Sequence, residues 1–468
     1  MSGATICTAD EKATRAGRAA NCGTVEAGTL TNPDLSYVIL TAGGGVSGTF
    51  DGLTADEDFV FLDPALTYAA TSVTLGLDRN GTSFASLAET DNGRNVAEAL
   101  DKAASGDLFD ALLRQTTAAD AARAFELASG EVYGGVGSAL ITSGLLSDDL
   151  VLAHLRALDA RASAARGVAP LAYDETADAG GRFSSFGAPV AGESRGNLGA
   201  WAAGYGDWTR FSGDGLADVD SATGGFLAGL DGEIGGWAVG IAGGYAHTDI
   251  DADDLLSSAD ADSYQVTLYG GRSFGALNVG LGGAYAYHDI EASRSVVFPG
   301  FSDSLAADID ADSLRLFGEV SYDMMLGGIA AQPFAGLSWT HLSVDDFTET
   351  GGAAALSSDG YDQDLGASTL GVRLATSFEA NGMTVSPRAT LGWRHAFGDT
   401  QPDVALSFVD TGADFSVSGA PIAKDAAIVE AGVDVEVAPN ATLGISYRGN
   451  FGDDANSNGA TGRFAVKF

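Results

Sequence analysis

The chain has 468 residues and a formal net charge of −39, from 24 basic and 63 acidic side chains. Binding to a phosphate backbone depends on Lys and Arg, so this balance excludes nucleic acid as a class of partner. Glycine is abundant at 65 residues and charged residues make up only 19% of the chain, a composition typical of a glycine-rich sheet protein.

The first twenty residues, "MSGATICTADEKATRAGRAA", carry charges where a secretory signal would have an apolar core. If the protein is exported, we expect this numbering to begin after a removed signal or within a longer chain. The two cysteines, Cys7 and Cys22, have no zinc-ligand companions in the sequence. They form either a small disulfide loop in an oxidising compartment or two free thiols.

The chain up to residue 196 contains three regions that differ in composition and hydrophobic periodicity. Residues 1–92 alternate apolar and polar side chains in short pieces such as 35–42 and 72–77, which predicts short strands joined by turns. Residues 93–165 place apolar side chains three and four positions apart, which predicts a run of helices. The most apolar stretch of this predicted helical region, 132–147, is too short and too rich in Gly to cross lipid as a helix. Residues 166–196 have no sustained period and contain two prolines, as in a linker.

From residue 197 onward, segments of about ten residues alternate strictly, as in a transmembrane β-barrel. The connections between them alternate between tight turns and long polar loops, and an even strand number puts both ends on the short-turn side. We read 403–418 as a hairpin inside a long loop, because a thirteenth strand would separate the two ends. The predicted strands are 197–208, 222–233, 235–248, 262–273, 275–289, 310–324, 328–343, 364–379, 382–398, 424–438, 440–451 and 459–468.

Each predicted strand has one apolar and one polar or small face, which in a membrane barrel face lipid and lumen respectively. Aromatic residues near the strand ends are predicted to form the girdles at the lipid headgroups. These are Trp201, Tyr205, Trp237, Tyr245, Tyr285, Tyr287, Tyr322, Trp339, Trp393 and Tyr447. The polar side chains predicted to face the lumen are Arg315, Glu319, Arg373, Arg388, Arg394, Glu430, Asp434 and Arg448.

Several stretches resemble the autotransporters of Gram-negative outer membranes, the type V secretion system. "SYVILTAGGGVSGTFDGL" and "FLDPALTYAATSVTLGLDRN" resemble the last rungs of a pertactin-like passenger β-helix. "ALDKAASGDLFDALL" and "FELASGEVYGGVGSALITSGLLSDDLVLAHLRA" resemble the family's junction before the barrel. "GAWAAGYGDW", "QPFAGLSW" and "LGWRHAFGD" are similar to its barrel strands.

The resemblance implies a mainly β protein in which a 12-stranded antiparallel transmembrane barrel follows a helical junction and a short β-helix-like stub. Its domains would be a passenger remnant at 1–92, a junction at 93–165, a linker at 166–196 and the outer-membrane barrel at 197–468. Such a protein secretes its own N-terminal passenger and anchors it at the cell surface. About 90 residues precede the junction here, so we expect the effector part to be missing or minimal.

The resemblance also implies a helix that plugs the lumen, for which residues 145–163 are the candidate, with Asp148, Asp149, Arg156, Asp159 and Arg161 as partners for the wall. Some members release the passenger between two adjacent asparagines in this helix. No such pair occurs between 93 and 196, so that mechanism is not transferred.

The ending "RFAVKF" has the pattern of the closing strand, with Phe464, Val466 and Phe468 facing lipid. In the family a terminal aromatic residue is read by the barrel assembly machinery. The expected partners are therefore that machinery, outer-membrane lipid and the chain's own passenger, with the protein a monomer.

Other motifs carry weaker signals. "GGGVSG" lacks the Lys and the following helix of a phosphate loop. His247 with Asp249, and His288 with Asp289, stand where a barrel hydrolase would place a dyad, although solvated rim residues account for both pairs. The Asp-rich runs at 249–254, 260–262 and 308–312 lack the spacing of a calcium loop. We therefore predict no catalytic, cofactor or metal residue. The alternative function is an adhesin or hydrolase that acts through the extracellular loops.

Overall fold

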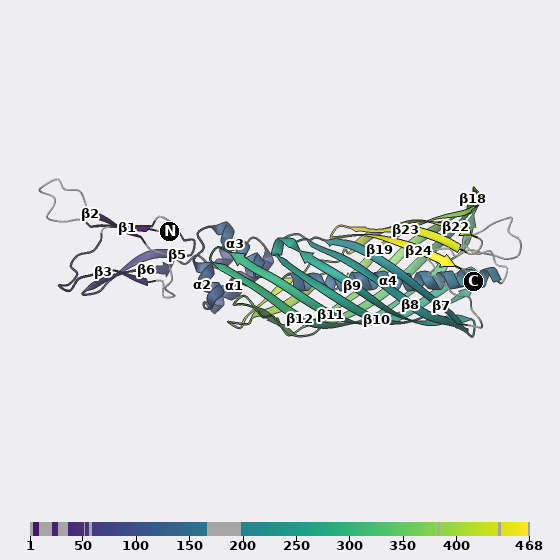
Figure 1. Ribbon diagram of the computed structural model, residues 1–468, viewed down its shortest axis with the longest axis horizontal. Coiled ribbons are helices and arrows are strands. Elements are labelled where there is room, and N and C mark those ends of the chain that lie inside the picture. Colours follow the sequence, from purple (N-terminus) through teal and green to yellow (C-terminus); the bar gives the residue numbers. More distant parts are fainter. Residues whose placement is uncertain are drawn as a thin grey trace. The chain divides into compact units, whose positions relative to one another are not determined.

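The computed structural model in Figure 1 describes residues 3–8, 21–26, 36–50, 52–55, 59–165, 198–381, 383–438 and 441–466. The predicted linker at 166–196 and the terminal Phe468 lie outside these residues. The chain forms two compact units, which are described separately. One contains Met1–Ser129 with Val296–Asp303 and Asp410–Ala413, and the other contains Gly130–Ser295, Ser304–Val409 and Asp414–Phe468.

The N-terminal unit begins with two small antiparallel sheets, in the orders β2-β1-β4 and β3-β6-β5. The strands are β1 (Gly3–Thr8), β2 (Asn21–Glu26), β3 (Ser36–Thr41), β4 (Gly52–Ala55), β5 (Leu62–Tyr68) and β6 (Ser72–Arg79). Rungs of a β-helix pair in parallel, so the described pairings differ from the β-helix-like stub that we predicted. The turn between β5 and β6 is too short for the crossover that parallel strands need. The backbone register places Cys7 opposite Cys22.

A helical block follows, made of η2 (Phe84–Leu87), α1 (Asp91–Ala103), α2 (Asp107–Leu113) and α3 (Ala118–Leu127). The side chain of Thr90 caps α1 by accepting a hydrogen bond from Gly93 N at 3.0 Å. Its hydroxyl also donates to Glu126 Oε1 at 2.7 Å, which ties α1 to α3. Burial raises the pKa of the Glu126 carboxyl, and the hydrogen bond from Thr90 opposes this shift. Phe84 packs against Phe125 in the core of this block.

The second unit is a closed antiparallel barrel of twelve strands, as predicted. Figure 1 shows the strands wound around a central helix. The barrel closes where β24 pairs with β7, from Ala455 opposite Phe211 to Ala460 opposite Gly206, so neither strand leaves an open edge. The barrel strands are β7 (Leu198–Phe211), β8 (Val219–Ile234), β9 (Trp237–Ala252), β10 (Ser257–Phe274), β11 (Leu277–Phe298), β12 (Phe301–Tyr322), β14 (Ile329–Val344), β17 (Tyr361–Ala375), β19 (Met383–Gly398), β22 (Asp425–Ala438), β23 (Ala441–Gly452) and β24 (Ala455–Val466).

Shorter strands lie at both ends of the barrel. The predicted hairpin at 403–418 is confirmed, because its strands belong to a separate sheet of order β15-β16-β20-β21. The remaining elements are η3 (Asp253–Leu255), β13 (Met324–Leu326), β15 (Phe347–Thr348), β16 (Leu356–Ser358), β18 (Phe378–Ala380), β20 (Asp403–Phe408) and β21 (Ala413–Ser418). At the short-turn end, Gly235 and Gly236 join β8 to β9 with φ of 60° and 81°, a backbone that favours glycine.

The barrel strands are longer than predicted at the long-loop end. The regions 249–261 and 290–309, predicted as loops, are mostly strand, and β11 and β12 each have 22 residues. On β12 the outward side chains change from Leu314 and Leu316 to Asp308 and Asp310 with no break in the alternation. The outward side chains thus change from apolar to acidic within a continuous strand, whereas we had read these aspartates as the ends of strands.

Most of the aromatic residues predicted for the girdle lie on the outer face of the barrel, but the two predicted on β7 do not. Tyr285, Tyr322 and Trp393 are among the aromatic residues exposed on the outer face. Trp201 is only 3% exposed and faces the lumen, as does the half-buried Tyr205. Trp208 has the opposite parity and is 59% exposed on the outside. We had assigned the residues of β7 by their position near a strand end, whereas the parity of the strand decides which face they occupy.

The central helix, α4 (Val132–Ala165), begins thirteen residues before the predicted position 145. Its segment Val132–Arg156 has the length and hydropathy of a membrane-crossing helix, but 72% of the most apolar window is buried inside the protein. Val151, Leu152 and Leu155 pack against inward side chains of the barrel. The apolar surface of α4 is therefore covered by the inner wall and not by lipid.

We predict that charge is tolerated on the outer face of β12 only beyond the lipid boundary. Leu316→Arg should destabilise the folded barrel by about 2–4 kcal/mol, because it places a cation in the hydrocarbon layer. Asp308→Arg, on the same face of the same strand, should change the free energy of unfolding little. Urea unfolding in lipid vesicles measures both changes, and equal effects of the two substitutions would contradict this placement of the boundary.

Candidate functional site

The helix α4 runs through the lumen from the long-loop end to the short-turn end. Near its start, Tyr133 packs against Phe347 with ring centroids 4.4 Å apart, beside the long-loop end of β14. Further along, His154 stacks on Trp201 at 4.4 Å, close to the first residue of β7 at the short-turn end. The lumen filled by this helix is the candidate functional site.

Small residues let the first turns of α4 approach the wall closely. A Cβ atom on Gly134 would lie 2.5 Å from Gly419 Cα, a distance that no side chain could accept without a backbone shift. One turn further on, Ser138 Oγ donates to Ala420 O at 2.6 Å. The Gly-rich composition of 132–144 therefore serves close packing inside the barrel.

At the long-loop end, a buried set of contacts holds the start of the helix. Arg294 on β11 makes two hydrogen bonds to Glu349, Nε to Oε1 at 2.6 Å and Nη2 to Oε2 at 2.9 Å. The Tyr133 hydroxyl donates to the same carboxylate. The side chains of Arg294 and Glu349 are 1% and 0% exposed. Removing either partner would leave an unpaired charge in the interior, so the pair fixes the start of α4.

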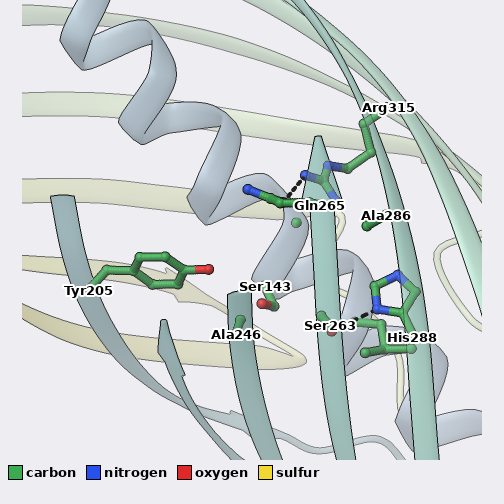
Figure 2. A pocket seen from close by; sticks show the side chains of 10 residues that line it. Ser143, Tyr205, Ala246, Ser263, Gln265, Ala286, His288 and Arg315 are labelled. Atoms are coloured by element: carbon green, nitrogen blue, oxygen red, sulfur yellow. Dashed lines mark hydrogen bonds between the residues drawn. The ribbon is translucent and has the colours of Figure 1, made fainter. Parts of the chain in front are cut away.

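In the middle of the lumen, Asp148 and Ser147 of α4 meet Arg315 of β12. The guanidinium donates through Nε to Asp148 Oδ1 at 3.2 Å and through Nη2 to Ser147 Oγ at 2.9 Å. It also donates to Gln265 Oε1 of β10 at 2.7 Å, and Figure 2 shows these two wall side chains together. One arginine therefore links the helix to two neighbouring regions of the wall.

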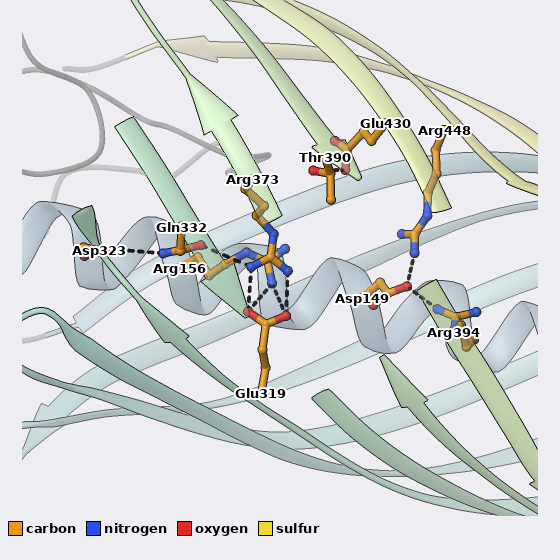
Figure 3. A network of polar contacts seen from close by, with 10 residues as sticks. All are labelled: Asp149, Arg156, Glu319, Asp323, Gln332, Arg373, Thr390, Arg394, Glu430 and Arg448. Atoms are coloured by element: carbon orange, nitrogen blue, oxygen red, sulfur yellow. Dashed lines mark hydrogen bonds and ion pairs between the residues drawn. The ribbon is translucent and has the colours of Figure 1, made fainter. Parts of the chain in front are cut away.

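The next residue, Asp149, faces two other arginines. Arg394 of β19 donates to Asp149 Oδ2 at 3.2 Å, and Arg448 of β23 donates to the same oxygen (Figure 3). Adjacent positions on a helix point in different directions, so Asp148 and Asp149 reach different parts of the wall.

A third polar group lies about two turns further along α4. Arg156 Nη1 lies 3.3 Å from Glu319 Oε1 of β12. Arg373 of β17 binds the same carboxylate at 2.8 and 2.6 Å, as Figure 3 shows. Arg373 also donates to Gln332 Oε1 at 3.1 Å and lies over the Phe334 ring. Glu319 thus neutralises one cation from the helix and one from the wall.

The short-turn end of the lumen is closed by aromatic and aliphatic side chains around His154. Its Nε2 lies 2.7 Å from Asp231 Oδ2 of β8, and both side chains are almost fully buried. Trp201 Nε1 donates to Tyr269 Oη at 2.5 Å in the same layer. Sequence reasoning missed His154 and Asp231. The polar Asp231 on the inward parity of an otherwise apolar segment was the available signal.

Among the wall residues predicted to face the lumen, Arg315, Glu319, Arg373, Arg394 and Arg448 form the contacts above. The others interact within the wall. Arg388 lies 4.0 Å from Asp434, with both side chains 7% exposed, and Glu430 accepts from Thr390 at 3.5 Å. On the helix, the side chains of Asp159 and Arg161 lie outside the described residues. The side chains of Phe464, Val466 and Phe468 do so as well, although the backbone of the first two belongs to β24.

His288 and Asp289 do not form the dyad that we considered, because successive residues of a strand point to opposite faces. His288 faces inward, is 3% exposed and lies between Ser263 Oγ at 2.7 Å and Ser313 Oγ at 3.0 Å. Figure 2 shows it in a small pocket with Ser263, near Arg315. Asp289 is exposed on the outside of the barrel. A solvated rim histidine is therefore also the wrong description of His288.

Comparisons with known proteins agree with this architecture. The family profile "Autotransporter beta-domain" matches residues 200–448. An extracellular serine protease of Serratia marcescens is 33% identical over 476 residues, which cover 92% of this chain and 43% of that protein. A second such protease from the same organism is 30% identical with the same coverage. The chain therefore spans less than half the length of these curated relatives.

Matches among solved structures include the translocator domain of the autotransporter NalP from Neisseria meningitidis. It has 15% identity and a TM-score of 0.46 and covers 57% of this chain and 87% of its own. The transport unit of AIDA-I from Escherichia coli has 15% identity and a TM-score of 0.38, with 59% and 92% covered.

We predict that Glu319→Ala loosens the helix inside the barrel. The substitution leaves Arg156 and Arg373 without their carboxylate, and breaking such a buried pair costs about 3–5 kcal/mol. We expect a lower urea midpoint, and more frequent open-channel events in planar bilayers. The control is Asp220→Ala, which breaks a solvent-exposed pair with Arg210 on the outer face and should have little effect. A Glu319→Ala barrel as closed and as stable as the wild type would contradict a role for Glu319 in holding α4.

Proposed function

The chain belongs to the autotransporter family, and we propose that residues 1–92 are the end of its passenger, which its own barrel carried to the cell surface. Residues 200–448 match the β-domain of the family, an outer-membrane translocator barrel with a helix in its lumen. On this proposal 93–165 is the junction, 166–196 is the linker, and the barrel domain covers 197–468.

The course of α4 is the observation that supports this proposal most directly. Its first turn contacts Phe347 and Glu349 at the long-loop end, whereas β7 starts at the short-turn end. The chain thus crosses the lumen once before the barrel begins. In a barrel whose long loops face outward, residues that precede α4 would lie outside the cell. This is the arrangement of a completed secretion, with the helix closing the pore.

The polar contacts of α4 suit a plug that forms after transport. An unfolded passenger needs an open lumen with a polar, hydrated wall, and the arginines at 315, 394 and 448 supply such a wall. Once the passenger has passed, Asp148 and Asp149 neutralise these arginines and keep the helix in place. We propose that the same wall residues serve both states.

We further propose that the barrel itself catalyses no reaction. The Serratia relatives are named as serine proteases, and a proteolytic activity of the whole protein would belong to passenger residues. The alternative of a barrel hydrolase is not supported by His288 and Asp289, which occupy opposite faces of β11. The proposed partners are outer-membrane lipid around the apolar face, the chain's own passenger, and the barrel assembly machinery, with the barrel as a monomer.

Surface display provides the first test. The full chain, exported behind a cleavable signal peptide with an epitope tag before residue 1, should present the tag to antibody on intact cells. Protease added outside should remove the tag, while the barrel remains in the outer-membrane fraction with heat-modifiable migration on a gel. A tag that becomes accessible only after the cells are lysed would overturn the proposal.

The second test concerns the ending Phe464, Val466 and Phe468, which we propose as the assembly signal. Deletion of Phe468 should lower the amount of heat-modifiable barrel in the membrane, because the machinery loses the terminal aromatic side chain. Lys467→Ala, which keeps that aromatic residue, serves as the control. Equal assembly of the Phe468 deletion and the control would argue against the signal.

A further inference from the structure

The outer face of the barrel carries a square of four polar side chains on β9 and β10. In the register of these strands His247 lies opposite Asp262, and Asp249 lies opposite Asp260. Because side chains alternate along a strand, all four point away from the lumen. They lie just beyond Tyr245 and Tyr264, the outward aromatic residues of the same two strands. The square is therefore in water, next to the lipid boundary.

The imidazole of His247 is oriented by Asp262. Nδ1 lies 2.8 Å from Asp262 Oδ1, and this carboxylate also accepts from the Tyr245 hydroxyl at 2.6 Å. A carboxylate only accepts hydrogen bonds, so Nδ1 carries the proton and Nε2 has a free lone pair in the neutral ring. In proteins, a metal-binding histidine commonly donates a hydrogen bond from its other ring nitrogen to a carboxylate, which orients the ring.

The Nε2 atom of His247 faces two carboxylates. It lies 3.4 Å from Asp249 Oδ1, and the ligand atoms of His247, Asp249 and Asp260 are all within 4.8 Å of one another. The neutral imidazole nitrogen and both carboxylates are all hydrogen-bond acceptors. The negative charges of Asp249 and Asp260, which lie directly opposite each other on two strands, repel one another. A cation between them would remove the repulsion. Exposed side chains need only small rotations to reach the bond lengths of about 2.0–2.2 Å that zinc requires.

The neighbouring strand leaves room for the cation and for a further ligand. On β8, Gly224 lies opposite His247 and Ala222 lies opposite Asp249. A Cβ atom on Gly224 would have no other atom within 4 Å. The site is thus open on this side, as is usual where a metal ion keeps a position for water or an exogenous ligand.

Two other outward histidines show what is particular to His247. His341 lies 3.2 Å from Asp364, and His395 lies 3.0 Å from Asp425, each through Nδ1 and across neighbouring strands. Across the part of the chain that the structure describes, only His247, Asp249 and Asp260 form a group of three whose possible ligand atoms lie within 4.8 Å of one another. The other two pairs therefore serve as internal controls.

We propose that His247 Nε2, Asp249 and Asp260 bind a divalent transition metal ion of the zinc type on the outer surface of the barrel, with Asp262 as the positioning residue. An imidazole among the ligands favours zinc, copper or nickel over calcium and magnesium, which prefer oxygen ligands alone. This site is separate from the lumen and does not depend on the direction of secretion.

The test is a titration of Zn²⁺ alone into the full chain, folded in detergent micelles and prepared without a polyhistidine tag. Cys7 and Cys22 are replaced by Ser throughout, because thiolates would compete for zinc. We expect saturable binding of one Zn²⁺ per chain. His247→Ala should weaken it by more than about 100-fold, since losing a ligand exceeds the loss of an outer partner. His395→Ala should bind as the parent protein does.

The positioning role of Asp262 is tested by the Zn²⁺ affinity of two further variants. Asp262→Ala should weaken Zn²⁺ binding by about 10–100-fold. Asp262→Asn should restore most of the affinity, because its amide oxygen still accepts from Nδ1. Heat-modifiable migration checks that every variant is folded.

Three outcomes would overturn the proposal. They are no saturable Zn²⁺ binding, equal binding by His247→Ala and the parent, or an equal loss in His395→Ala. A parallel titration with Ca²⁺ should give weak binding that His247→Ala leaves unchanged. If His247→Ala also left Zn²⁺ binding unchanged, that binding would reflect only a general attraction of cations to the acidic surface.

Discussion

Charge neutralisation between α4 and the inner wall of the barrel is the interaction on which the described structure depends. Asp148, Asp149 and Arg156 come from the helix, and each meets a wall residue of opposite charge. The lumen is narrow and largely filled, so neither set of charges has enough water to remain unpaired at low cost. The helix therefore cannot slide or rotate without exposing several charges at once.

The two ends of the lumen are held by other means. At the long-loop end, Arg294 and Glu349 form a buried pair that also binds Tyr133. At the short-turn end, apolar packing around Trp201 and Tyr269 surrounds His154. Polar contacts in the middle set the register of α4, and the layers at its ends keep it centred. Such an arrangement suits a plug that must be absent during transport and stable afterwards.

On the same strands, the side chains of the outer face follow a different pattern from those that face the lumen. Along β12 the outward residues pass from Leu to Asp, while the inward residues stay buried, from Leu305 and Ile309 to Arg315 and Glu319. One strand thus serves the membrane, the aqueous exterior and the lumen without any change of backbone. The adjacent residues His288 and Asp289 illustrate this, because one is buried in the lumen and the other is solvated outside.

The sequence by itself determined the barrel, its strand number and the inward parity of the arginines at 315, 373, 394 and 448, because an alternation with period two leaves each strand only one way to face lipid. It also indicated that Asp148, Asp149 and Arg156 would face the wall. Only the tertiary structure decided which helix charge meets which wall charge, since the pairs join residues more than a hundred positions apart. It also decided that β9 to β12 are longer at the long-loop end than the predicted strands, and that the described N-terminal strands pair antiparallel. Local composition could not decide these points, because Asp and Gly are equally compatible with a loop and with a strand whose outer face is in water.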